Sequence, residues 1–317
     1  MSAAKKQDSS SSPATRPWSL FSWLLGAGRP LLVVLVVVGL FGGGSYLLWQ
    51  KFKLRILAAP EYRVGPEQVE ITPTPAWIHS DIRAEVFRDP SLDGPLSLMD
   101  DNLTEQIGNA FALHPWVAKV ARVGKRHPSS SHPASVTVEL VYRQPVCMVD
   151  VPKGVLAVDA EGVLLPSEDF SPLEAARYPR LVGVEQQPAG LPPGRRWGDA
   201  RVVGGAEIAA ALGSAWEVMR LQRIVPLAAG TAPGAAETGP DDSARRAREP
   251  IFVLFTRVGT RIFWGYAPGA NMLGELSAGE KVARLQSYLA EHDTLDAPQD
   301  HPQELDVRTL ARSRARP

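Results

Sequence analysis

A long apolar run near the start of the chain is the strongest pattern in the sequence. Residues 31–49 carry no charged side chain, and Lys51 follows them closely. At about 1.5 Å of rise per residue, a helix of this length spans close to the ~30 Å hydrocarbon core of a bilayer. Tyr46 and Trp49 stand at its end, where aromatic rings favour the membrane interface. The pattern predicts one transmembrane helix over residues 30–50.

An uncleaved anchor is favoured over a cleaved signal peptide, because the apolar run exceeds the ~7–15 residues of a signal sequence. Basic residues flank the run on both sides, so charge counting leaves its orientation open. Gly39 and Gly43 form a G-x-x-x-G pair, a pattern that also arises by chance in such helices. Residues 1–17 are polar and rich in serine, residues 18–25 are apolar, and residues 1–29 together are predicted to be a disordered tail.

Residues 64–144 change between the periodicities of strands and helices. The predicted elements are a strand at 69–71, a helix spanning Ile78, Ile82 and Val86, a helix with Met99, Leu103, Ile107 and Phe111 on one face, and strands at 117–123 and 136–142. Ser97 and Asp100 form a predicted capping box for the second helix. Pro115 ends that helix, because the residue before proline is pushed out of the helical region. The predicted order is β-α-α-β-β.

Residues 145–311 are richer in strands. The predicted elements are strands at 146–151, 155–158, 163–165, 181–183, 221–227, 251–257, 261–266 and 304–310, a helix through Ile208, Leu212, Ala215 and Met219, and a helix from Ser277 to His292. Residues 228–248 contain almost no large apolar side chain and are predicted to be a disordered insertion. Residues 312–317 form a basic tail. The predicted fold class is α+β, with one N-terminal transmembrane helix, a small β-α-α-β-β domain and a β-rich domain of mixed sheet and flanking helices.

The charge and the cysteine content of the chain argue against several classes of function. The formal net charge is zero over 317 residues, so no global field favours nucleic acid. Cys147 is the single cysteine, which excludes an intramolecular disulfide and a thiolate metal cluster. It lies in a strongly apolar strand and is predicted to be a small buried hydrophobe.

No pattern of catalytic or metal-binding residues stands out. The six histidines do not have the spacing of metal ligands, and the chain lacks a phosphate-binding glycine loop and a nucleophile elbow. We therefore expect no enzymatic activity, no cofactor and no metal. The sequence does not exclude a catalytic pair of carboxylates that come together only in the folded chain.

Several short motifs stand in a definite order along the chain. They are His114-Pro115-Trp116-Val117, Tyr142-Arg143-Gln144-Pro145-Val146, Asp159-x-x-Gly162, Pro179-Arg180-Leu181-Val182-Gly183, Gly259-Thr260-Arg261 leading to Trp264-Gly265, Glu280-Lys281-x-x-Arg284-Leu285, and Asp306-Val307-Arg308. No single motif is specific. Together, after one membrane span, they resemble the FtsQ/DivIB family of bacterial cell-division proteins. Residues 228–248 and 267–278 lengthen loops beyond the family's compact pattern, and little strand follows Asp306-Val307-Arg308.

The resemblance implies a POTRA domain at 64–144 and a β domain at 145–311. It implies a cytoplasmic N-terminus, a single pass through the inner membrane, and an extracytoplasmic C-terminal part at the division site. Such proteins are scaffolds of the divisome that catalyse no reaction. They recruit small coiled-coil membrane partners of the FtsB and FtsL kind and connect them to septal peptidoglycan synthesis.

A partner-binding site is predicted at the last strand and the helix before it. A final strand is often an edge strand, whose unpaired backbone groups accept a strand from another chain. The resemblance points to the same region. The predicted residues are Val307, Arg308, Thr309 and Leu310 on the strand, and Lys281, Arg284 and Tyr288 on the helix. Arg308 is open to a second interpretation, an internal salt bridge.

Two other functions are weighed against a division scaffold. A POTRA-containing component of an envelope export or assembly system would be expected to carry several POTRA repeats or a following barrel of alternating strands. A membrane-tethered cell-wall hydrolase would be expected to carry a convergent catalytic constellation. The sequence shows neither pattern.

Overall fold

The computed structural model describes residues 29–57, 62–92, 96–129, 132–185, 190–227, 249–296 and 303–308. The predicted polar tail up to residue 28, the predicted insertion at 228–248 and the basic tail at 312–317 lie outside these residues. Thr309 and Leu310 also lie outside them. The chain divides into two compact units, residues 1–63 and residues 64–317, which are described separately.

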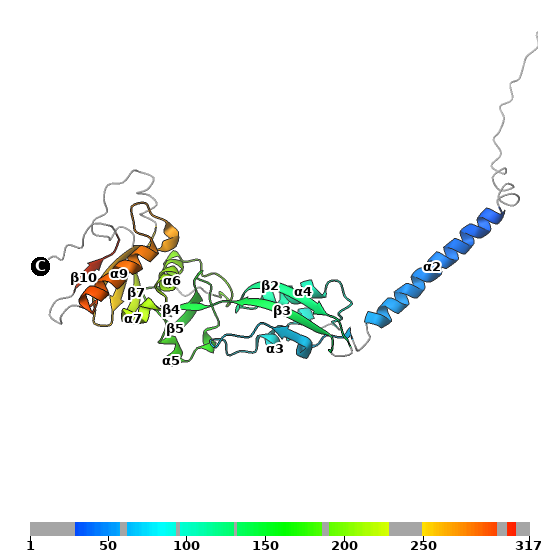
Figure 1. Ribbon diagram of the computed structural model, residues 1–317, viewed down its shortest axis with the longest axis horizontal. Helices are drawn as coiled ribbons and strands as arrows, with labels where there is room; N and C mark the ends of the chain where they lie inside the picture. The colour runs from blue at the N-terminus through cyan, green and yellow to red at the C-terminus, as the bar shows by residue number, and fades with distance from the viewer. Residues whose placement is uncertain are drawn as a thin grey trace, which may run out of the picture. The chain divides into compact units, whose positions relative to one another are not determined.

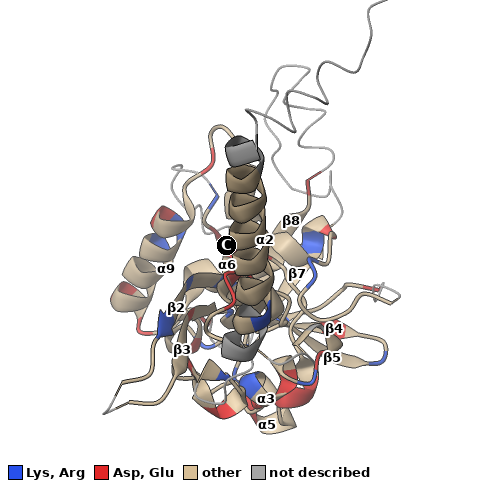
Figure 2. Cartoon of the chain, turned by 90° about the vertical axis from the view of Figure 1, so that its right-hand side faces the viewer, with Lys and Arg blue, Asp and Glu red and all other residues tan. Residues whose placement is uncertain are grey.

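The described part of the first unit is one helix, α2 (Arg29–Leu57). Its segment Val33–Phe52 is long and apolar enough to cross a membrane, and none of it is buried within the protein. Figure 2 shows the tan, uncharged run along most of α2. The helix continues past its predicted end at residue 50, because Lys, Leu and Arg are good helix formers and the next proline is Pro60.

The second unit begins with a small mixed sheet and two helices (Figure 1). Its elements are β1 (Val69–Ile71), α3 (Ile82–Val86), α4 (Leu103–Ala112), β2 (Val117–Arg126) and β3 (Ser135–Tyr142), with 3-10 turns at Pro66–Gln68 and Pro90–Leu92. The strand order is β1-β3-β2. Strand β3 runs parallel to β1 and antiparallel to β2. The element order β-α-α-β-β is the one that the sequence pattern predicts.

Both helices of this region begin later than predicted. Asp81 caps α3 by accepting a hydrogen bond from the Ala84 amide at 3.1 Å, so Ile78 precedes the helix. The capping box at Ser97 is wrong, because the Ser97 carbonyl accepts from the Asp100 amide in a turn and α4 starts only at Leu103. That turn buries Leu98 and leaves Met99 exposed.

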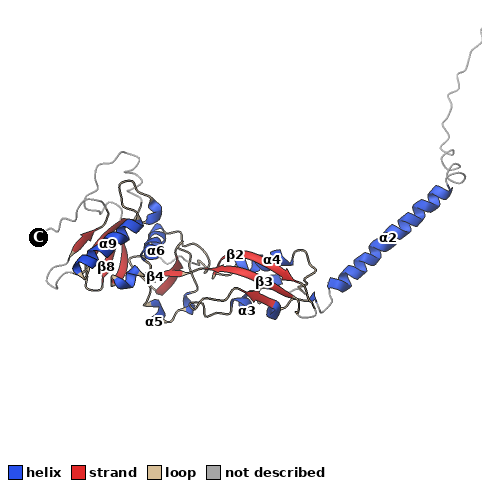
Figure 3. Ribbon diagram, viewed as in Figure 1, coloured by secondary structure: helices blue, strands red, loops and turns tan. Residues whose placement is uncertain are grey.

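The rest of the second unit is built on a second mixed sheet (Figure 3). Its strands are β4 (Pro145–Val151), β5 (Gly154–Asp159), β6 (Arg180–Leu181), β7 (Leu221–Leu227), β8 (Ile251–Thr256), β9 (Arg261–Tyr266) and β10 (Glu304–Asp306). The strand order is β10-β9-β8-β7-β6-β4-β5. The pairs β10–β9, β7–β6 and β6–β4 are parallel, and the others are antiparallel.

Helices α6 (Ala200–Leu212) and α9 (Ala278–His292) cover one face of this sheet. The remaining short elements are α5 (Pro172–Ala175), α7 (Ala215–Val218) and 3-10 turns at Ser167–Asp169 and Pro268–Ala270. Strand register aligns the row of core residues Val149, Leu181, Ile224, Leu254, Ile262 and Leu305 beneath the helices. Gly204 and Gly205 let α6 approach closely, because added Cβ atoms would lie 2.6 Å from Phe252 and 2.7 Å from Leu181.

The sequence pattern misplaces two elements here. The predicted strand at 163–165 forms only isolated bridges, Val163 to Arg196 and Val158 to Leu164. The predicted helix through Ile208 and Met219 breaks at Gly213, whose φ of 48° ends α6. Cys147 is fully buried as predicted, and burial raises the pKa of its thiol to about 12.

Candidate functional site

Strand β10 forms the margin of the second sheet, as predicted for the last strand. The Arg261 amide donates to the Gln303 carbonyl at 3.0 Å, and the Val307 amide donates to the Phe263 carbonyl at 3.2 Å. In a parallel ladder these bonds direct alternate residues toward β9, so the backbone groups of Glu304 and Asp306 face the opposite way. No strand among the described residues pairs with that side. This outward side of β10 is the candidate partner-binding edge.

The predicted strand over 304–310 is too long, because β10 ends at Asp306 and Val307 and Arg308 follow it. These two residues have unequal access to a partner. Val307 is buried, with 3% of its surface exposed, and belongs to the core. Arg308 makes the internal salt bridge that the sequence left open. Its Nη2 donates to Asp306 Oδ2 at 2.6 Å and its Nε donates to Asp306 Oδ1 at 3.0 Å. This hydrogen bonding raises the pKa of Arg308. Burial raises the pKa of Asp306, but the hydrogen bonds and charge of Arg308 outweigh it, and the net pKa is lowered.

Lys281 is a correction to the expected surface, because the residue lies in the interior with 2% of its total surface exposed. Its Nζ donates to Glu275 Oε1 at 2.9 Å and lies 5.1 Å from the centroid of the Trp264 ring. Burial raises the pKa of Glu275 and lowers the pKa of Lys281, since each charge is taken out of water. Lys281 therefore affects the edge only through the residues it holds in place.

Glu275 is a residue that sequence reasoning missed. Its carboxylate accepts from the Tyr266 amide at 3.0 Å as well as from Lys281, which fixes the loop before α9 to the end of β9. The Leu276 amide donates to the Arg308 carbonyl at 3.0 Å and joins the same loop to the chain just after β10. We call Glu275, Lys281, Asp306 and Arg308 the edge cluster. It holds the candidate edge against the sheet.

Arg284 and Tyr288 lie half-buried on α9 beside this region. The Tyr288 ring stacks on His292 at 4.1 Å between centroids, and its hydroxyl accepts a hydrogen bond from Gln303 Nε2, just before β10. The positive charge of Arg284 contributes to lowering the pKa of Asp306. Tyr288 is thus linked to the start of β10, and Arg284 is linked to its end.

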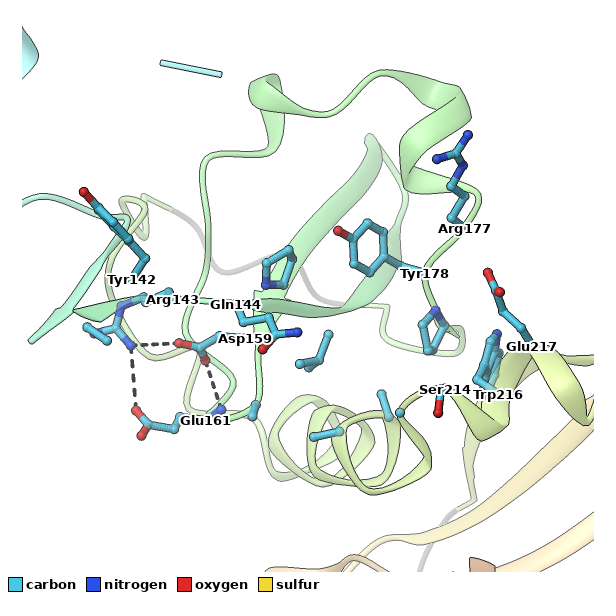
Figure 4. Close-up of a pocket in the computed structure, with 18 residues that line it drawn as sticks. Tyr142, Arg143, Gln144, Asp159, Glu161, Arg177, Tyr178, Ser214, Trp216 and Glu217 are labelled. Atoms are coloured by element: carbon cyan, nitrogen blue, oxygen red, sulfur yellow. Dashed lines mark hydrogen bonds and ion pairs between the residues drawn. The ribbon is translucent and has the colours of Figure 1, made fainter. Parts of the chain in front are cut away.

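Two motifs that lie apart in the sequence meet at a second place (Figure 4). Arg143, from the Arg-x-Pro motif, donates through Nη1 to Asp159 Oδ2 at 2.7 Å. Asp159, from the Asp-x-x-Gly motif, accepts from the Val163 amide at 2.8 Å and the Glu161 amide at 3.0 Å. The ion pair therefore links the end of the first sheet to the β5 turn.

A cavity of about 490 Å³ opens beside this ion pair. Its walls come from the β3–β4 connection, the C-terminal end of α6 and the α5–β6 connection, and include Tyr142, Tyr178 and Trp216. We call it the junction cavity. Across the described residues, no group of three His, Cys, Asp or Glu side chains is placed to hold a metal ion.

Neither a protein-family model nor a curated protein matches the chain. A proposal of function therefore rests on the chain's own residues and their arrangement.

Proposed function

We propose that the chain is a non-enzymatic, single-pass membrane scaffold of the bacterial division complex. In this proposal α2 is the membrane anchor, residues 64–144 are a POTRA domain and residues 145–311 are a β domain outside the cytoplasmic membrane. The β10 edge receives an extended strand from a partner of the FtsB or FtsL kind, and the complex supports septal peptidoglycan synthesis.

The order of the family motifs along the chain supports this function. The ion pair between Arg143 and Asp159 adds to that support, since it brings two of those motifs into contact at the point where the sheets meet. The observation that carries the proposal is the marginal position of β10, with the backbone of Glu304 and Asp306 directed away from β9. Strand addition to such an edge supplies affinity through main-chain hydrogen bonds.

Glu304→Pro tests the β10 edge with little change to the sheet. Proline removes the outward amide of residue 304 and leaves the bonds to β9 in place, and edge strands tolerate it. We expect capture of FtsB-like or FtsL-like partners to fall about tenfold, because one main-chain bond is lost and the ring obstructs an incoming strand. The measurement is co-purification of the full chain from membranes with immunodetection of the partners.

Glu304→Ala is the matched control. It removes the same exposed ion pair with Arg261, whose atoms lie 3.2 Å apart, but keeps the amide. It is expected to capture partners like the unaltered chain. Equal capture by both variants and the unaltered chain would argue against strand addition at β10. Arg308→Glu is a poorer test, since it would place a carboxylate beside Asp306 and Glu275 and disturb the fold.

A fluorescent fusion separates the division role from an export or assembly role. The proposal predicts enrichment of the full chain at mid-cell during septation, and loss of septation on depletion. A uniform envelope signal together with an export defect on depletion would favour the export alternative. A fusion carrying Glu304→Ala serves as the control for expression and membrane insertion.

A further inference from the structure

A second cavity, of about 510 Å³, is lined by residues of β6, β7 and the connections that precede these two strands. Successive residues of a strand point to opposite faces. The row next to the helix-covered core row is therefore on the outer face. In register across the sheet it consists of Met148, Arg180, Arg223, Phe255, Arg261 and Glu304. The cavity lies where Arg180 and Arg223 stand side by side on β6 and β7.

The lining of this cavity, which we call the arginine cavity, has an excess of positive charge. Arg177, Arg180, Arg223 and Arg257 line it, against the carboxylates of Asp150 and Glu217. Arg180 is paired with Asp150. Within the described ranges, no carboxylate lies at ion-pair distance from the other three arginines. The Arg223 guanidinium lies 4.6 Å from the Phe255 ring centroid, with its N–H groups left for a ligand.

Two nearby acids already have partners, because Asp150 pairs with Arg180 and Glu174 accepts from Ser171. Glu174, whose pKa is lowered first by its hydrogen bond with Ser171 and which also feels the charge of Arg177, accepts from the Ser171 hydroxyl at 2.7 Å. An anion entering the arginine cavity would therefore meet four guanidinium groups against two carboxylates, those of Asp150 and Glu217. Planar guanidinium groups bind carboxylates through paired hydrogen bonds, which favours an acidic occupant.

The chain itself offers no long acidic segment to fill this cavity. Residues 1–28 and 309–317 carry more basic than acidic side chains. Residues 228–248 balance three acidic residues against three arginines. Charge complementarity therefore points to an occupant from another molecule.

The arginine cavity adjoins the junction cavity, because Arg177, Tyr178, Trp216 and Glu217 line both. The junction cavity contributes apolar and aromatic walls, including Pro145 and Tyr178. Two adjoining hollows of about 490 and 510 Å³ are more than a single small anion occupies, and they suit several residues of an extended chain at ~3.3 Å each.

We propose that the two cavities together form a docking groove for an extended acidic segment of a partner protein. Its carboxylates bind Arg177, Arg223 and Arg257, and its apolar side chains contact the Tyr178 side of the junction cavity. This groove is separate from the β10 edge, so the proposal holds whether or not β10 accepts a strand.

The test uses the full chain in detergent and a short fluorescent peptide in which Asp and Glu alternate with Pro and Val. A second peptide carries Asn and Gln in place of the acids. Fluorescence anisotropy is expected to show salt-sensitive binding of the acidic peptide only. Arg223→Gln and Arg257→Gln are each expected to weaken it about five- to tenfold, since each removes a charge-assisted contact.

Arg122→Gln is the matched control, because Arg122 is an exposed arginine on β2 of the other sheet. It and Glu304→Pro are expected to bind the acidic peptide like the unaltered chain. The proposal is overturned if the neutral peptide binds equally well, or if Arg122→Gln is as damaging as Arg223→Gln. Loss of binding in Glu304→Pro would place the peptide at β10 instead. Displacement by inorganic phosphate at equal concentration would indicate a small-anion site and also overturn it.

Discussion

Gly265→Ala is expected to lower the free energy of unfolding by about 3 kcal/mol or more, because strain and a clash act together. Gly265 has a φ of 93°, a conformation that side chains rarely adopt. An added Cβ would lie 1.6 Å from Glu275 Oε1 and 3.0 Å from Arg308 Cγ. The Glu275 carboxylate would have to leave both Lys281 and the Tyr266 amide, which would strand a buried charge. One methyl group thus disturbs the whole edge cluster.

The loss is measured by denaturant unfolding of the full chain in detergent, followed by tryptophan fluorescence. Gly259→Ala is the matched control, since Gly259 also has a positive φ, of 112°, but nothing lies within 4 Å of its added Cβ. Only backbone strain applies there, which amounts to about 1–2 kcal/mol. Equal losses at the two positions would show that Gly265 has no special relation to Glu275.

Lys281→Ala is expected to destabilise the chain by about 3–5 kcal/mol, because it leaves the Glu275 carboxylate without its buried partner. The two side chains are 3% and 12% exposed, so water cannot replace the lost interaction easily. The same change removes the cation from the face of Trp264. The measurement is again the free energy of unfolding of the full chain.

The double variant Glu275→Gln with Lys281→Met tests whether the unpaired carboxylate causes the loss of stability in Lys281→Ala. Glutamine keeps an acceptor for the Tyr266 amide, and methionine fills the space of the lysine stem without a charge. The pair is expected to recover more than half of the stability lost in Lys281→Ala, since neutral replacement of a buried ion pair costs little. A double variant as unstable as Lys281→Ala would mean that packing, and not the unpaired carboxylate, accounts for the loss.

Elements with local signals could be predicted from the sequence. Helix α9 begins where Ser277 and Glu280 form a reciprocal capping box, and the β8–β9 hairpin follows two apolar runs around Gly259. Each depends on residues a few positions apart. The start of α4 depends on a turn that buries Leu98 against the core, and the break at Gly213 depends on backbone geometry that the spacing of Ile208 and Met219 does not reveal.

The candidate partner-binding edge was only partly predictable, because some of its contacts come from a loop that has no periodic pattern. The last position in sequence and the last position in the sheet coincide for β10, as expected. Lys281 was predicted to contact a partner because it lies on the helix before the last strand, yet it stands one turn before the buried Leu285 on the apolar face of α9. The four-residue spacing from Lys281 to Leu285 was the signal in the sequence that Lys281 is buried. Its partner Glu275 comes from a loop, and a loop contact leaves no periodic trace in a sequence.

The ion pair between Arg143 and Asp159 joins residues whose motifs are visible in the sequence. Arg143 and Asp159 each belong to a short motif, but nothing in their spacing of 16 positions places one against the other. The contact follows from the antiparallel hairpin of β4 and β5, which returns Asp159 to the level of Pro145. The pairing of β4 with β5, and not the spacing of the two charged residues, decides that they meet.

The solitary thiol of Cys147, sealed among the strands, makes this chain convenient for site-directed labelling. Maleimides and spin labels react with thiolates, and a fully enclosed sulfhydryl with a pKa near 12 supplies almost none at neutral pH. A cysteine introduced at the rim of either proposed contact surface would be the principal reactive one in the native sequence background. Distances and accessibility at those surfaces are therefore measurable without first removing any native residue.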